Sequence, residues 1–61
     1  MEKEALELFK GKEVKIILKG SGSRTFVLTG KIDFVFQSCI RFRTPQKTAI
    51  IDFGQILEVQ G

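Results

Sequence analysis

The sequence predicts a mainly β protein, with a short N-terminal helix followed by five antiparallel strands in one small, strongly bent barrel. Apolar residues follow a helical period only near the start of the chain. From Glu13 onward they recur at every second position, which is typical of half-buried strands. Short turns separate these segments, so successive strands should pair antiparallel. A glycine inside the longest segment, Gly30, predicts a sharp bend or a close backbone approach.

Residues 2–10 are expected to form the helix. Ala5, Leu6 and Phe9 fall on one side of a 3.6-residue period, and acidic residues stand near the start, where the helix macrodipole favours them. Gly11 is a candidate C-cap. A helix of about nine residues is unstable alone, so its apolar stripe must pack against the strands.

The first strand is expected at residues 13–19, with Val14, Ile16 and Leu18 on its buried side. The turn Gly20–Ser23 is rich in residues that tolerate positive φ. The second strand, residues 25–36, is long for a small domain and could serve two layers of a barrel. Its apolar residues, with Gly30 in the one empty slot, are Phe26, Leu28, Ile32, Phe34 and Phe36.

Phe26 and Phe34 are therefore expected in the core. Three shorter strands follow at residues 38–43, 48–53 and 56–60. Thr44–Lys47, which contains a proline, joins the third strand to the fourth, and Gly54 with Gln55 joins the fourth to the fifth. Residues 1–61 would form one domain, with the helix at about 2–10 and the barrel at about 13–60. Closure of the barrel would protect the strand edges.

The small size of the chain limits how it can be stabilised. A chain of 61 residues buries only about 60% of the surface it exposes when unfolded, and domains of this size usually need disulfides, a metal or partner subunits. The single cysteine excludes an internal disulfide, and without histidine there is no ordinary zinc ligand set. A very compact core or self-association remains.

The residues give little support for catalysis. No histidine is available as a base near neutral pH, and Cys39 lies among apolar strand residues, so we expect a small buried side chain and no nucleophile. Asp33 and Asp52 stand apart in the sequence, and nothing in the sequence pairs them as an acid and a base. Gly20–Gly22 lacks the lysine of a phosphate loop. We expect no enzyme activity, cofactor or metal.

Two features bear on location. No apolar run approaches the ~20 residues of a membrane-spanning helix, and the charged start lacks the apolar region of a secretory signal. With one free thiol, the expected location is the cytoplasm, with no membrane partner.

A net charge of +3 permits a polyanionic partner. Lys15 and Lys19 share one strand face, and Arg41 and Arg43 share another. Such cations either discourage aggregation at strand edges or contact phosphates.

Two aromatic residues, Phe36 and Phe53, end apolar strands next to turns. Each is either a core residue or a platform for an unpaired base, where stacking contributes roughly 1–3 kcal/mol per base.

The pattern as a whole resembles the Sm-like superfamily, which includes the LSm and bacterial Hfq proteins. The resemblance is carried by Gly11–Lys19, by Leu28–Ile32 with its bend glycine, and by Ala49–Val59. It implies a homo-oligomeric ring, a hexamer or heptamer, in which the fourth strand of one subunit pairs with the fifth of the next. It also implies an RNA chaperone or scaffold that binds single-stranded RNA at loops corresponding to residues 34–38 and 52–55.

The loop sequences differ from the family motifs. Only Gln37 offers an amide where the first motif has aspartate and asparagine, and Asp52 stands where Sm proteins have arginine. The Lys-His pair of Hfq is replaced by Phe53 and Gly54. The residues expected to bind RNA are Phe36, Gln37, Ser38, Phe53, Gly54 and Gln55 at the bases, and Lys15, Lys19, Arg24, Arg41 and Arg43 at the phosphates. Two alternatives stay open: a ring that binds proteins without RNA, and a monomeric SH3-like protein that binds DNA.

Overall fold

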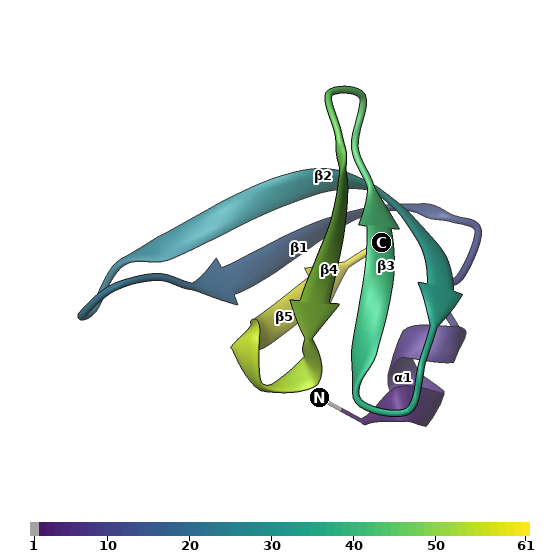
Figure 1. Ribbon diagram of the computed structural model, residues 1–61, viewed down its shortest axis with the longest axis horizontal. Helices are drawn as coiled ribbons and strands as arrows, with labels where there is room; N and C mark the ends of the chain where they lie inside the picture. The colour runs from purple at the N-terminus through teal and green to yellow at the C-terminus, as the bar shows by residue number, and fades with distance from the viewer. Residues whose placement is uncertain (1) are drawn as a thin grey trace.

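A computed structural model describes residues 2–61 of the chain (Figure 1). Met1, which the predicted domain includes, lies outside the described residues. The elements, in order, are α1 (Lys3–Glu7), β1 (Glu13–Lys19), β2 (Thr25–Val35), β3 (Cys39–Arg43), β4 (Thr48–Asp52), the 3-10 helix η1 (Phe53–Gln55) and β5 (Ile56–Gln60). The predicted fold class is confirmed: one short helix is followed by five antiparallel strands in a single curved sheet, ordered β4-β3-β2-β1-β5.

β2 creates the curvature by taking part in two halves of the sheet. Its residues from Thr25 to Lys31 pair with β1, and those from Lys31 to Val35 pair with β3. Gly30 lies at the change of partner, where a Cβ atom would collide with the backbone carbonyl of Arg43. The glycine predicted at a bend therefore permits a close approach of two backbones.

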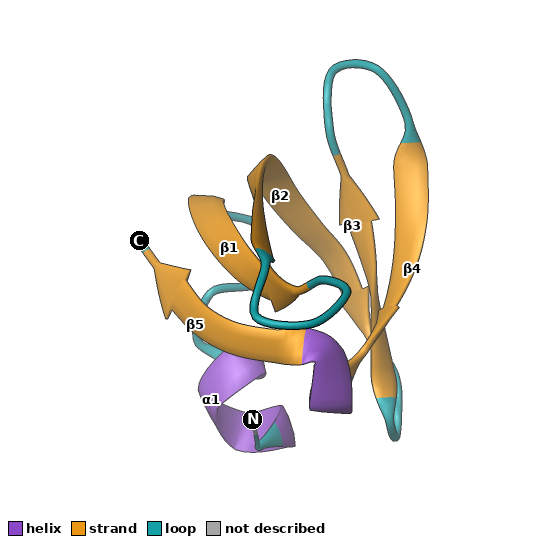
Figure 2. Ribbon diagram, turned by 90° about the vertical axis from the view of Figure 1, so that its left-hand side faces the viewer, coloured by secondary structure: helices purple, strands orange, loops and turns teal. Residues whose placement is uncertain are grey.

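The core occupies the inside of this curved sheet. Leu6 of α1 is fully buried against it, and α1 lies at one end of the sheet (Figure 2). The short helix thus contributes one side chain that covers the core, as its apolar stripe predicts. The buried hydrophobic residues are Leu6, Val14, Ile16, Ile32, Val35, Ile40, Phe42, Ile51 and Ile56.

The helix is shorter than predicted because the chain tightens after Glu7. The N–H groups of Phe9 and Lys10 donate to carbonyl oxygens three residues earlier, at 3.1 Å and 3.2 Å, in the manner of a 3-10 turn. Gly11 follows with a φ of 80°, and its N–H donates to the carbonyl of Ile32. The glycine allows this positive φ and redirects the chain toward β1.

A bulge in β2 reverses the predicted alternation. The register with β3 shifts between Ile32 and Phe34, so that Asp33 is the extra residue. Val35 then points inward and is buried, whereas Phe34 is 42% exposed. The prediction that Phe34 belongs to the core is wrong for this reason.

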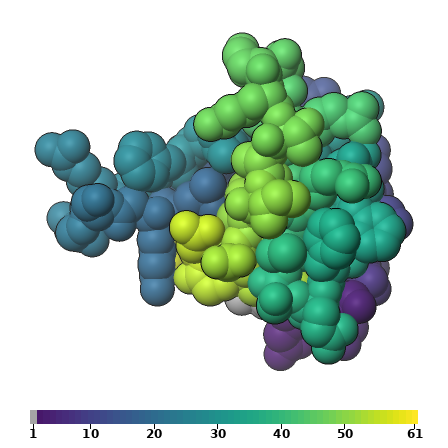
Figure 3. Space-filling model, in the orientation of Figure 1, coloured from purple at the N-terminus to yellow at the C-terminus, as the bar shows by residue number. Residues whose placement is uncertain are grey.

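The prediction that Phe26 belongs to the core is also wrong. The β1–β2 hairpin extends away from the body of the molecule (Figures 1 and 3), and Phe26 near its end is 57% exposed. Cys39 is half-buried, so it is less enclosed than its apolar neighbours in the sequence suggested.

The sheet stays open in the single chain. β4 and β5 are consecutive in sequence, but they stand at opposite ends of the strand order, and no pairing joins them within residues 2–61. The predicted curvature is present, but the expected protection of the edges by closure is not provided by this chain alone.

Candidate nucleic-acid interface

The two predicted base-binding loops lie side by side. The turn after β2 is closed by the N–H of Phe36, which donates to the carbonyl of Cys39 at 2.8 Å. The N–H of Phe53, at the start of η1, donates to the carbonyl of Ser38 at 3.0 Å. This second bond extends the pairing of β3 with β4, in which Cys39 is opposite Asp52. Segments fifteen residues apart in the sequence are therefore joined at one end of the sheet.

The loop side chains differ in exposure. Phe36 is 37% exposed, and Gln37 and Ser38 are exposed beside it. Phe53 is half-buried and packs against the core. Of the two alternatives for these aromatics, the core role is therefore correct for Phe53 and wrong for Phe36.

Gly54 and Gln55 complete the second loop and are both exposed. The side-chain oxygen of Gln55 accepts a hydrogen bond from the N–H of Asp52 at 3.2 Å, and the Asp52 carboxylate accepts from the backbone of Gln55 in return. This reciprocal pair is a capping box, which fixes the turn. The amide oxygen of Gln55 thus has a structural role, and a carboxylate stands beside the loop.

Arg41 and Arg43 lie together on the outer face of β3, where both bind Asp33. The Nε of Arg41 lies 2.8 Å from one carboxylate oxygen, and a terminal nitrogen of Arg43 binds the other. These hydrogen bonds, with that from Arg43 the stronger influence, hold the pKa of Asp33 below its ordinary value. The two arginines predicted to contact phosphates are therefore partly neutralised by a carboxylate that the bulge directs outward.

An exposed aromatic pair extends the same surface. The rings of Phe34 and Phe36 are 4.8 Å apart at a tilt of 51°. The ammonium of Lys10 lies 4.8 Å from the centre of the Phe34 ring, and the guanidinium of Arg41 lies 5.9 Å from it. Both distances suit cation–π contacts.

The sequence contained a signal for this surface. Phe34, Val35 and Phe36 are consecutive, so they cannot all point inward from a regular strand. In a regular strand with Phe34 and Phe36 outside and Val35 inside, Asp33 would point inward. A bulge at Asp33 turns its carboxylate to the outer face, within reach of the arginines of the next strand.

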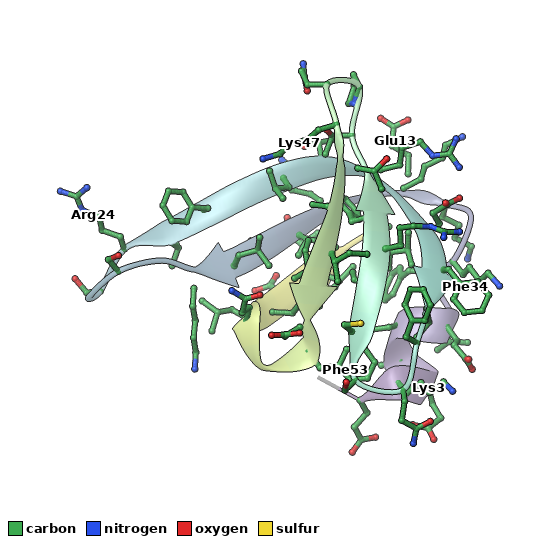
Figure 4. All side chains as sticks on the ribbon, viewed as in Figure 1. Lys3, Glu13, Arg24, Phe34, Lys47 and Phe53 are labelled. Atoms are coloured by element: carbon green, nitrogen blue, oxygen red, sulfur yellow. The ribbon has the colours of Figure 1, made fainter. Side chains whose placement is uncertain are left out.

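The remaining predicted cations lie elsewhere. Lys15 and Lys19 are exposed on β1, and Arg24 is exposed in the turn at the end of the hairpin. In Figure 4, Arg24 lies at the end of the extended hairpin, well away from Phe53. The predicted site therefore divides into two joined loops, an arginine–aspartate surface on β3, and a basic hairpin.

Within residues 2–61, no group of three or more histidine, cysteine, aspartate or glutamate side chains could hold a metal ion. None of the helices described there has the length and apolar character needed to cross a membrane. Comparisons with protein-family models, curated proteins and solved structures found no match to this chain.

Proposed function

We propose that this chain is a subunit of an Sm-like homo-oligomeric ring that binds single-stranded RNA in the cytoplasm, as an RNA chaperone or scaffold without catalytic activity. The observation that carries the proposal is the bond between the Phe53 N–H and the Ser38 carbonyl, which holds two exposed loops together. An aromatic ring at Phe36 and an amide at Gln37 are then available on one side of each subunit. Single-stranded nucleic acid is bound by such combinations of stacking and polar groups.

The ring is supported by the two open edges of the sheet. β4 and β5 end the strand order, and each carries a large exposed apolar residue: Ile50 is 60% exposed and Leu57 is 48% exposed. Unpaired edges of this kind readily pair with another chain. Pairing of β4 with β5 of the next copy would satisfy both edges, and six or seven subunits would close the ring, as the resemblance implies.

Phosphates would be bound by the exposed cations of each subunit. Lys15, Lys19 and Arg24 form the basic hairpin, whereas Arg41 and Arg43 would have to exchange Asp33 for a phosphate. Each chain carries a net charge of +3, so a ring multiplies the positive field that attracts RNA.

Native mass spectrometry with and without an oligonucleotide tests the ring and the RNA together. We expect a single closed stoichiometry, and a further mass shift with U-rich or A-rich RNA of about 10 nucleotides, a length within the range that small barrels bind. A monomeric mass would exclude the ring and favour the SH3-like DNA-binding alternative. A ring that binds neither RNA at low salt would exclude the RNA function.

A change of Phe36 to alanine tests the position of the bases. We expect the affinity for U-rich RNA to fall about tenfold, because one stacked base contributes roughly 1–3 kcal/mol. The control is Phe26→Ala, which removes a ring that is even more exposed, at 57%, from the hairpin and should leave affinity nearly unchanged. Equal losses from the two variants in a fluorescence titration would contradict base binding at the loops.

A ring that binds proteins without RNA is the second candidate. It is favoured by the carboxylate of Asp52 beside the loops and by the pairing of Asp33 with both arginines, since each reduces the attraction for phosphate. Pull-downs with and without nuclease separate the two candidates. Partners that are retained after nuclease treatment, together with absent RNA binding, would select the protein-binding ring.

A further inference from the structure

A third stretch of unpaired strand edge lies on β2. Residues 25–30 pair with β1 on one side only, because β3 ends at Arg43, opposite Lys31. In an antiparallel ladder, alternate residues direct their N–H and C=O groups to opposite sides. About half of the backbone groups in this segment therefore point away from β1, and no strand of residues 2–61 pairs with them.

A groove of about 760 Å³ runs beside this edge. One wall is the segment of β2 from Val27 to Lys31, and the other is the turn from Arg43 to Lys47 between β3 and β4. Figure 2 shows this turn projecting away from β2. An extended chain placed in the groove would lie against the free edge of β2.

The turn that forms the far wall is held by its own hydrogen bonds. The N–H of Thr44 donates to the carbonyl of Lys47 at 2.8 Å, and the Thr44 hydroxyl accepts from the N–H of Lys47 at 3.1 Å. The same hydroxyl also accepts from the N–H of Gln46 at 3.3 Å. The wall is preorganised, so a ligand need not order it, and preorganisation reduces the cost of binding.

The side chains of the groove combine apolar surface with positive charge. Val27 is 54% exposed, and Leu28 and Pro45 add apolar surface. Three cations, Lys31, Arg43 and Lys47, line the groove with one carboxylate, that of Glu13. Lys47 and Glu13 are labelled in Figure 4, near the turn. The charges favour an acidic ligand with some apolar side chains.

We propose that this edge of β2 binds an extended, acidic segment of a partner protein by strand addition. Main-chain hydrogen bonds to residues 25–30 would provide affinity, and Lys31 and Lys47 would select acidic side chains, as in other strand-addition sites. The phosphodiester groups of a nucleic acid only accept hydrogen bonds, and its hydroxyl and base donors do not recur at the spacing of a strand, so a peptide fits the edge better than a nucleic acid does. This site remains open in the proposed ring, where β4 and β5 are occupied, and it does not depend on RNA binding.

Fluorescein-labelled peptides of about seven residues test the proposal, since a strand rises about 3.3 Å per residue. The first probe alternates valine and glutamate, and the second has lysine in place of glutamate. The third is the first with every backbone amide N-methylated, so that neither of its edges can donate. Binding to the full chain is measured by anisotropy, and NMR locates the perturbed amides. We expect the glutamate peptide to bind and the other two peptides to bind at least tenfold more weakly. We also expect the glutamate peptide to shift the NMR signals of amides within residues 25–30 and 44–47.

Charge reversal at Lys47 gives the matching test on the protein. Lys47 is exposed in the turn, so Lys47→Glu should keep the fold and weaken the binding of the glutamate peptide about tenfold. Lys3→Glu makes the same charge change on α1, outside the groove, and should have little effect. The proposal fails if the glutamate peptide does not bind, if either control peptide binds equally well, or if the shifts lie on β4 or β5.

Two further outcomes would assign the groove to another occupant and overturn the proposal. One is perturbation of the groove amides by U-rich RNA and not by the peptide. The other is a shift of the same amides with protein concentration alone, which would indicate a second copy. Loss of RNA binding in Phe36→Ala, measured separately, tests the proposed RNA function without affecting the peptide result.

Discussion

Gly30 is the residue on which the curvature of the sheet depends most directly. The backbone of Arg43 occupies the place of a Cβ atom, and a backbone cannot rotate away as a side chain can. We expect Gly30→Ala to lower the free energy of unfolding by about 2 kcal/mol, because overpacking of this kind typically costs roughly 1–3 kcal/mol. Urea unfolding followed by circular dichroism measures the change.

Gly54 provides the matched control for this substitution. A Cβ atom there would meet nothing within 4 Å, and its φ is not in the left-handed region. Gly54→Ala should therefore be nearly neutral. Equal stabilities of the two variants would show that the close approach at Gly30 does not constrain the fold.

Asp33 makes stability depend on pH. Its carboxylate is stabilised by Arg43 and Arg41, so its pKa in the folded state lies below the ordinary value of 3.8. A depressed folded-state pKa adds stability that is fully present above the unfolded-state pKa and is lost as the pH falls through the folded-state pKa. The stability difference between the wild type and Asp33→Asn should be constant near neutral pH and shrink below about pH 4.

Unfolding by urea at a series of pH values checks this expectation. Glu7→Gln, which neutralises an exposed carboxylate on α1, serves as the control for removal of a charge alone. A difference between the wild type and Asp33→Asn that persists unchanged to pH values well below 4 would contradict a role for the ionised pair.

The same residues show why some side chains could be predicted from the sequence and others could not. The alternation that assigned Val14, Ile16 and Ile32 to the core is correct, because each lies in a regular stretch of strand. It fails for Phe34, because one extra residue at Asp33 reverses the face of everything that follows in the strand. A bulge is a feature of the pairing between two strands, so the periodicity of one strand does not predict it.

At the scale of elements, the positions of the strands are predicted better than the exposure of their side chains. The five strands lie within two residues of their expected positions, because turns rich in glycine, proline and serine separate them. The exposure of Phe26 does not follow from the periodicity, because β3 pairs with β2 only from Lys31 onward and leaves the end of the β1–β2 hairpin without a neighbour on that side. The adjacency of the two loops, by contrast, follows from the pairing of β3 with β4 and was implied by the resemblance.

The edge strands β4 and β5 would form the contact between copies in the proposed ring. Ile50 is exposed on β4, so its replacement by lysine should leave the monomer fold intact and oppose pairing with a neighbour by adding an edge charge. We expect Ile50→Lys to shift the mass measured by light scattering from the ring to the monomer. Leu8→Lys changes a side chain that is 72% exposed outside the strands and should keep the ring. Rings of equal mass from both variants would exclude β4 as the interface.

For the whole molecule, assembly and RNA affinity should be linked. One chain has one pair of loops and a net charge of +3, whereas the proposed ring would present several copies to the same strand of RNA. Linked sites raise the apparent affinity far above that of one site, since later contacts form at high effective concentration. More phosphates are also neutralised at once, which steepens the dependence of affinity on salt.

The dissociated variant separates assembly from charge. Ile50→Lys adds a positive charge to each chain, so electrostatics alone would strengthen RNA binding. We expect the opposite: affinity for U-rich RNA at least about tenfold weaker than in the wild type, and a shallower slope of log affinity against log salt. Titrations over a range of salt concentrations, with Leu8→Lys as the assembled variant of equal charge, measure both quantities. Tighter binding by Ile50→Lys than by Leu8→Lys would mean that RNA is bound by single chains and that the ring contributes nothing to recognition.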